Sequence, residues 1–170
     1  TAAFIEAIKH LSKFNNGYDI VLRPHPTESV ETWKVYLEGI PNVYVIREGS
    51  VTPWIANAFA VMHNGCTTSL EASVFGKPLL SYVPFKQEYN FDLANELGYR
   101  IESKEDLLRK ANTLFDILQS GNKNELDKEV PEQVSKKIYI DGDELAADKM
   151  IKDWESLANN NNISSRSSNW

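Results

Sequence analysis

The chain has 170 residues, of which 42% are hydrophobic and 25% charged, and its formal net charge is −6 at pH 7. This length suits one compact α/β domain with its own core, and the negative charge argues against a dedicated nucleic-acid binder. Cys66 is the only cysteine, which excludes an intrachain disulfide and an all-cysteine metal site and favours a reducing compartment.

Helical patterns recur along the chain, beginning with a stripe formed by Phe4, Ile8 and Leu11. Helix caps are expected at Thr27 and Ser103, and Thr52 followed by Pro53 predicts the start of a short helix. The expected helices cover residues 2–15, 27–38, 90–97, 103–118 and 141–157. A further short helix is expected to begin at 52–53, and another to end at Phe75.

Short apolar segments separate these helices and predict strands at 19–23, 43–46, 59–63, 79–83 and 99–101. Strands that are apolar on both faces and alternate with helices are typical of a parallel sheet with helices on both sides. We therefore expect one domain over residues 1–158, with a parallel sheet of about five strands. Residues 159–170 have too little apolar surface to order themselves, so we expect a disordered tail.

A small polar turn follows the third expected strand and precedes a helix that Gly76 and Pro78 end. Unpaired backbone N–H groups and the partial positive charge at a helix N-terminus suit a phosphate. The turn consists of Asn64, Gly65, Cys66, Thr67, Thr68 and Ser69.

Cationic side chains follow several of the expected strands. In a parallel sheet the carboxyl ends of all strands share one edge, where ligands bind. The residues expected at this edge are Arg23 and His25, then 47–50, then His63 with the polar turn, and finally Lys86 and Gln87. We expect an anionic ligand such as a phosphate ester there.

Several of these residues have a structural alternative. Glu71 could accept hydrogen bonds from the vicinal hydroxyls of a ribose, or it could close a capping box with Thr68. Arg23 could pair with a carboxylate, and His63 could be a core histidine. His25 lies between two prolines, which favours a ligand role. The three histidines lack the spacing of metal ligands, so no metal site is expected.

Three motifs carry a resemblance to a known family: RPHP (23–26), REGSVTPW (47–54) and HNGCTTSLEASVFGKPLLSYVP (63–84). Together they resemble the C-terminal half of bacterial surface-carbohydrate biosynthesis proteins, which have a glycosyltransferase-B-like fold. The resemblance covers residues 18–102. It implies a Rossmann-like three-layer α/β/α domain that binds the nucleotide of a sugar donor, and a further N-terminal domain that supplies the catalytic base.

The resemblance also implies roles for individual residues. His25 and Pro26 would contact the donor phosphate, with His25 and Arg23 stabilising the departing phosphate as the catalytic groups. Glu71 would bind the ribose. The polar turn would bind phosphate through Gly65, Thr67, Thr68 and Ser69, with His63 and Asn64 beside it. No cofactor is expected.

The expected function is therefore donor binding in a glycosyltransferase that builds a surface polysaccharide. The expected partners are a CMP- or UDP-sugar, a glycan or lipid-linked acceptor and the N-terminal domain, with no nucleic acid. No apolar run approaches the roughly 20 residues that span a bilayer, so we expect no transmembrane segment. We expect a cytoplasmic protein, either free or bound peripherally at the inner face of the membrane. The alternatives are half of a non-hydrolysing UDP-sugar 2-epimerase and a non-catalytic nucleotide-binding or scaffold module.

Overall fold

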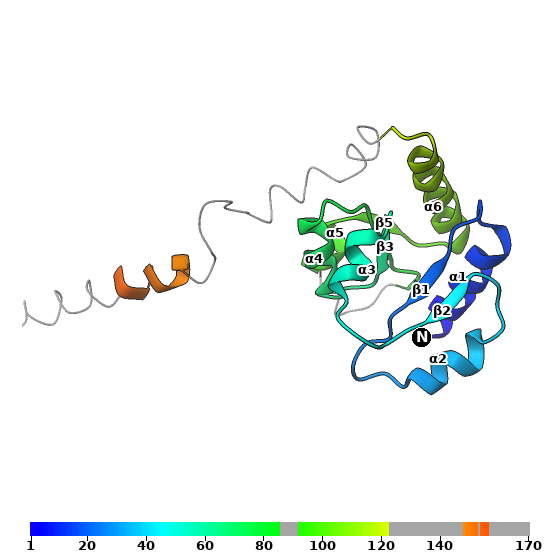
Figure 1. Cartoon of the computed structure of the whole chain (residues 1–170), viewed down its shortest axis with the longest axis horizontal. Coiled ribbons are helices and arrows are strands. Elements are labelled where there is room, and N and C mark those ends of the chain that lie inside the picture. The colour runs from blue at the N-terminus through cyan, green and yellow to red at the C-terminus, as the bar shows by residue number, and fades with distance from the viewer. Residues whose placement is uncertain (86–91, 123–147, 153, 157–170) are drawn as a thin grey trace, which may run out of the picture. The chain divides into compact units, whose positions relative to one another are not determined.

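The computed structural model describes residues 1–85, 92–122, 148–152 and 154–156 (Figure 1). The chain divides into two units, Thr1–Lys137 and Ile138–Trp170. In the second unit the described residues are helical, as predicted for that segment. The expected tail at 159–170 and the edge residues Lys86 and Gln87 lie outside the described residues.

In the first unit, helices and strands alternate along the whole described length, as the sequence predicts. The elements are α1 (Ala2–Phe14), β1 (Ile20–Leu22), α2 (Val30–Leu37), β2 (Val43–Val45), α3 (Thr52–Asn57), β3 (Val61–His63), α4 (Thr68–Val74), β4 (Leu79–Tyr82), α5 (Asp92–Glu96), β5 (Tyr99–Ile101) and α6 (Lys104–Gln119). None of the described helices is long and apolar enough to cross a bilayer.

The strands form two parallel sheets, which confirms the parallel pairing but corrects the expected single sheet of five. One sheet has the order β1-β2 and the other β3-β4-β5 (Figure 1). Each described pair is parallel, with Ile20 opposite Val43 in the first sheet and Val61 opposite Leu79 in the second. The single sheet is not formed because β1 and β3 do not hydrogen-bond to each other.

Helix α1 joins the two sheets through one amphipathic stripe. Ile5 and Ile8 pack with Trp33 and Leu37 of α2 over the first sheet. Ala7 and Leu11 pack instead with residues of β4, β5 and α6. Residues four apart lie on the same helix face, so a slightly widened stripe lets one helix serve both clusters.

The larger sheet has helices on both faces. Leu80 and Tyr82 of β4 belong to the cluster beneath α1 and α6. Alternate residues of a strand point to opposite faces, so Leu79 and Ser81 face the other side, and α4 and α5 contact the same strands. All four β4 residues are buried. This part of the molecule has the expected three layers.

Local signals for helix ends are confirmed in some places and corrected in others. Ser103 caps α6 by accepting a hydrogen bond from the Asp106 N–H at 3.1 Å. The helix before Gly76 ends at Val74 with Phe75 as its C-cap, within one residue of the predicted end. The expected cap of α2 at Thr27 is wrong, because Ser29 accepts the capping hydrogen bond from the Thr32 N–H at 3.2 Å. Thr27 instead bonds to the His25 ring.

Gly98 should tolerate no side chain, because a Cβ there would lie 2.5 Å from both the Cβ and the carbonyl oxygen of Leu79. Leu79 is fully buried in β4 and cannot move away. We expect Gly98→Ala to lower the free energy of unfolding by about 3 kcal/mol, measured by urea denaturation.

The matched control is Gly39→Ala, where a Cβ meets no atom within 4 Å but φ is +75°. Strain at that φ should cost about 1 kcal/mol. Equal losses in the two variants would show that backbone strain, and not the contact with Leu79, determines the effect.

Candidate functional site

Arg23 lies directly after β1 and holds the loop after β2. Its Nη1 donates to the Glu48 carbonyl at 3.0 Å, and its Nη2 donates to the Arg47 and Gly49 carbonyls at 3.1 and 2.6 Å. The guanidinium also lies over the Trp54 ring, 5.9 Å from its centroid. A planar fork of donors matches this row of carbonyls better than an ammonium would. Arg23 therefore joins the two loops by binding backbone, and not by the carboxylate pairing considered above.

Arg47 makes the return connection. Its Nη2 donates to the Pro26 carbonyl at 2.7 Å. The loop after β1 and the loop after β2 thus each send an arginine to the backbone of the other. This pair of contacts, here called the arginine clamp, consists of Arg23 on 47–49 and Arg47 on Pro26. It fixes the RPHP loop relative to the second strand.

His25 is exposed, and its ring is fixed in one orientation. The Thr27 N–H donates to Nδ1 at 3.3 Å, and the Thr27 hydroxyl lies 2.8 Å from the same nitrogen. Because Nδ1 accepts a hydrogen bond, the proton of the neutral ring lies on Nε2. The backbone around it is also bound, with the His25 N–H donating to Glu28 at 2.9 Å. The structure therefore presents an Nε2–H donor at the surface of the loop.

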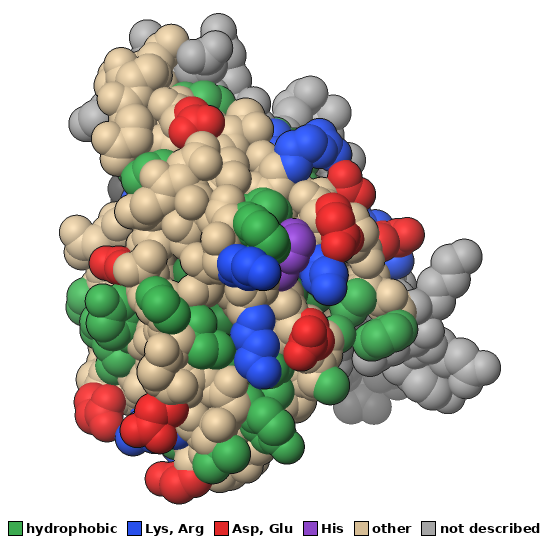
Figure 2. Space-filling model, turned by 90° about the vertical axis from the view of Figure 1, so that its right-hand side faces the viewer, with side chains coloured by type: hydrophobic (Ala, Val, Ile, Leu, Met, Phe, Trp, Pro, Cys, Tyr) green, Lys and Arg blue, Asp and Glu red, His purple; other side chains and the backbone are tan. Residues whose placement is uncertain are grey.

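Two carboxylates lie among these cations. Glu28 accepts from His25, and Glu48 accepts from the Arg47 N–H at 3.1 Å. The pKa of Glu48 is lowered, first by its own backbone N–H and by that of Arg47, with smaller contributions from the charges of Lys34 and Arg23. The charges of the clamp are thus balanced locally. Figure 2 likewise shows acidic, basic and hydrophobic side chains interspersed over one face of the molecule.

His63, at the end of β3, is buried beneath the polar turn. Its Nε2 lies 3.1 Å from the Ser81 hydroxyl, and both residues are buried. Among the described residues, Nδ1 of His63 has no hydrogen-bond partner. Burial lowers the pKa of His63 from 6.5 to about 4, so the ring is neutral at pH 7. The ring faces the interior, which agrees with the alternative that His63 is a core histidine, but only one of its two nitrogens has a hydrogen-bond partner among the described residues.

The polar turn is held from within. The Ser69 hydroxyl and N–H both bind the Cys66 carbonyl, at 2.8 and 3.1 Å, and Ser69 is fully buried. The Gly65 N–H donates to Oδ1 of Asn95 at 2.8 Å. The Cys66 sulfur accepts from the Thr68 N–H at 3.3 Å. Ser69 is thus a structural residue of the turn in this conformation, and the exposed Asn64 and Thr67 form its outer surface.

Glu71 has no capping role in this structure. Helix α4 begins at Thr68 with Thr67 as its N-cap, and no side chain caps it. The Glu71 side chain is exposed on the first turn. The capping box proposed for Thr68 and Glu71 is therefore not formed, and the carboxylate is available to a ligand.

The predicted residues thus form two groups. Arg23, His25 and Pro26 are joined to 47–49 by the arginine clamp, while His63 and the polar turn are joined to Ser81 and Asn95. No hydrogen bond connects the two groups among the described residues. No cluster of three or more His, Cys, Asp or Glu side chains that could hold a metal is found there either.

Two contributors were not predicted from the sequence. Asn95, which is 3% exposed in α5, binds the turn, and Trp54 in α3 lies under Arg23. The available signals were a polar residue directly after the apolar Ala94, and an aromatic residue within the REGSVTPW motif.

Comparison of the chain with models of protein families, with curated protein sequences and with solved structures found no match.

Arg23→Lys should destabilise the fold more than a comparable surface change, because lysine cannot bind three carbonyls in one plane. We expect a loss of about 1–2 kcal/mol in the free energy of unfolding. The matched control is Arg100→Lys, which alters an exposed pair with Glu102 at 3.3 Å and should cost under about 0.5 kcal/mol. Equal losses in urea denaturation would contradict the proposed role of the clamp.

His63 should make stability depend on pH. Its pKa in the folded protein is about 4, against an ordinary 6.5, so the unfolded state binds the proton more tightly. The free energy of unfolding should therefore fall as pH drops from 6.5 towards 4, by about 3 kcal/mol in total.

His63→Gln should remove this dependence, while His25→Gln should keep it. The measurement is chemical denaturation at several values between pH 4 and pH 7. An unchanged slope in the His63 variant would assign the effect to other groups.

Proposed function

We propose that this domain binds the donor nucleotide of a glycosyltransferase in surface polysaccharide biosynthesis, with a CMP- or UDP-sugar as donor. The observation that carries the proposal is the fixed ring of His25, which presents Nε2–H at the carboxyl end of β1. Because Thr27 already orients the imidazole ring, its Nε2–H group loses little conformational entropy when it donates a hydrogen bond to a phosphate oxygen. The resemblance of the RPHP, REGSVTPW and 63–84 motifs supports the same function.

The chemistry asked of the site is stabilisation of negative charge on the departing phosphate. Donors that are fixed before the reaction act in this way most effectively. In the proposal, His25 contacts the phosphate, and Arg23 positions the loop through the clamp, because its Nη1 and Nη2 groups already bind carbonyls. Helix α4 has only seven residues, and the N–H groups of Gly65, Thr68 and Ser69 are already bound within the protein. The proposal therefore relies on the Thr67 hydroxyl more than on the helix dipole or these backbone groups.

Ribose binding is assigned to Glu71, whose exposed carboxylate is not used as a cap. The scheme itself calls for no metal ion. We further propose that an N-terminal domain supplies the catalytic base and the acceptor-binding surface. The proposed location is the cytoplasm. The acceptor would be a glycan or a lipid-linked glycan.

A non-catalytic nucleotide-binding module is the second candidate. The balanced charges around the clamp favour it, because Glu28 and Glu48 reduce the attraction of the loop for an anion. Such a module would bind nucleotide weakly, and it would transfer no sugar even when an N-terminal domain is added to it.

Calorimetric titration with CMP, UMP and CDP tests the site. We expect His25→Ala to weaken binding about tenfold or more, since a hydrogen bond to a charged group is worth roughly 1.5–3 kcal/mol. Glu71→Gln should weaken CMP more than its 2′-deoxy analogue, because the lost charge-assisted bonds involve the ribose hydroxyls.

His10→Ala, in α1, is the matched control and should bind as the wild type does. Equal affinities in the wild type and in the His25 and Glu71 variants, with folding intact, would place the site elsewhere.

A further inference from the structure

Strand β1 has one paired edge and one open edge. The Ile20 N–H donates to the Asn42 carbonyl at 2.7 Å, and the Ile46 N–H donates to the Leu22 carbonyl at 3.0 Å. Ile20 and Leu22 thus direct their backbone groups to β2. Because successive residues of a strand direct these groups to opposite sides, the N–H and C=O of Val21 point away from β2. Neither has a partner among the described residues.

Strand β3 has an open edge of the same kind. The Val61 N–H donates to the Pro78 carbonyl at 2.9 Å, so Val61 and His63 direct their backbone groups to β4. The N–H and C=O of Met62 therefore point away from β4, and within the described part of the chain they too have no partner. Val21 is an exposed apolar residue and Met62 is half-buried, and on this side the backbone groups of both are unpaired among the described residues.

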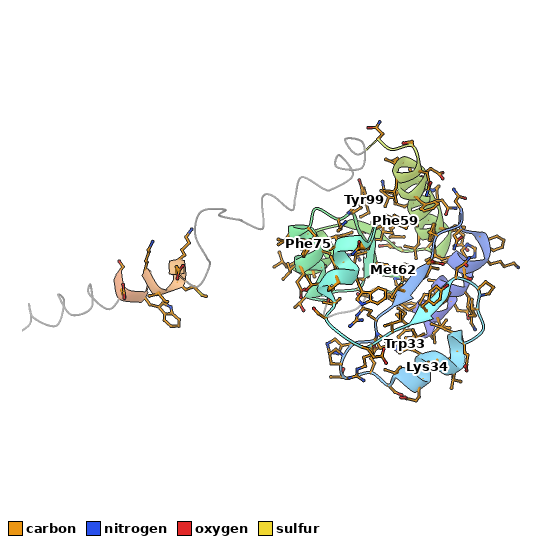
Figure 3. The ribbon with its side chains drawn as sticks, in the orientation of Figure 1. Trp33, Lys34, Phe59, Met62, Phe75 and Tyr99 are labelled. Carbon is orange, nitrogen blue, oxygen red and sulfur yellow. The ribbon has the colours of Figure 1, made fainter. Side chains whose placement is uncertain are left out.

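The two open edges lie in the same part of the molecule. Ile20 of β1 and Met62 of β3 both pack against the cluster beneath α1 and α6 and against the cluster beneath α1 and α2. Figure 3 shows Met62, a residue of β3, in the middle of the first unit. Helix α1, which supplies buried residues to both clusters, covers this region.

Neither edge has the protection that natural edge strands carry. Exposed edges usually bear charges, proline or a bulge that prevents further pairing. The residues of β1 are Ile, Val and Leu, and those of β3 are Val, Met and a neutral, buried His. By contrast, β5 at the far edge of its sheet carries Arg100. Strands without charge that are apolar on both faces are typical of the interior of a parallel sheet.

We propose that β1 and β3 take up one further strand between them, parallel to both, giving a single sheet in the order β2-β1-added strand-β3-β4-β5. One strand would pair with the open groups of Val21 on one side and of Met62 on the other. It would be short, extended and apolar on both faces, as its neighbours are.

The occupant we assign is an extended segment that leads directly into Thr1. Helix α1 connects to β1 through residues 15–19, so the beginning of α1 lies towards the carboxyl ends of the strands. A parallel strand in the gap would end at those carboxyl ends and could reach Thr1 through a short loop, which completes a strand–helix–strand unit with α1 and β1. Other occupants, such as a second copy of the chain, lack this connection.

This inference does not depend on the proposed function, and its test involves no nucleotide. If it holds, the loop between the added strand and Thr1 would lie at the carboxyl edge with the RPHP loop and the polar turn, which now make no contact by hydrogen bonds.

The test is hydrogen exchange at the amides of Val21 and Met62. The probe is the whole chain extended before Thr1 by a strand of about five residues, Val-Ile-Val-Leu-Val, and an Asn-Gly turn. The control extension has proline in place of the central valine, which removes a ladder donor. We expect both amides to exchange rapidly in the unextended chain and about 100-fold more slowly with the strand extension, but not with the proline control. The amides of Ile20 and Val61 should be protected throughout.

Three results would overturn the proposal. Slow exchange at Val21 and Met62 in the unextended chain at low concentration would show that the edges are already closed. Equal exchange with the two extensions would show that no strand enters. Protection that grows with protein concentration, accompanied by dimers in sedimentation, would assign the edges to a second copy of the chain.

Discussion

The packing of α1 is the interaction on which the described fold depends. A two-stranded sheet is marginal in water, and a three-stranded sheet must bury an apolar face to be stable, so each sheet here needs an apolar cover. Helix α1 supplies it to both, with Ile5 and Ile8 on one side of its stripe and Ala7 and Leu11 on the other. The apolar area that it buries is therefore shared between the sheets, and loss of this helix would expose part of both, leaving α2 as cover of the first and α6 of the second.

The candidate site is built from loops that the backbone itself restrains. The arginine clamp uses guanidinium groups on carbonyls, and the polar turn uses Ser69 and Asn95 on backbone partners. Some residues whose chemical type suggests ligand binding instead hold the loops in place, whereas others have side chains that are free to contact a ligand. His25, Glu71 and Thr67 remain open, whereas Arg23 and Ser69 are largely occupied.

Local sequence signals predicted the elements well, because their causes are local. Apolar runs gave the five strand segments, and Gly76 and Ser103 marked helix ends that the structure confirms. The division into two sheets could not be predicted in this way, because which strands pair depends on contacts between residues far apart in the chain. The same holds for His63 with Ser81, and for Asn95 with Gly65, which are joined over 18 and 30 residues. The hydrogen bonds from Arg23 to backbone carbonyls could not be predicted either, because the type of a residue does not specify its partner.

The contact of Asn95 with the polar turn has a consequence for what the turn can recognise. A side-chain carbonyl oxygen already occupies the Gly65 N–H, so this donor is filled by the protein's own acceptor. Any molecule that approaches the turn must use the remaining groups or compete with a neighbour that is covalently present at all times. The effective concentration of that internal competitor is high. The Gly65 N–H is therefore not open to a ligand of the turn unless that ligand displaces the Asn95 side chain.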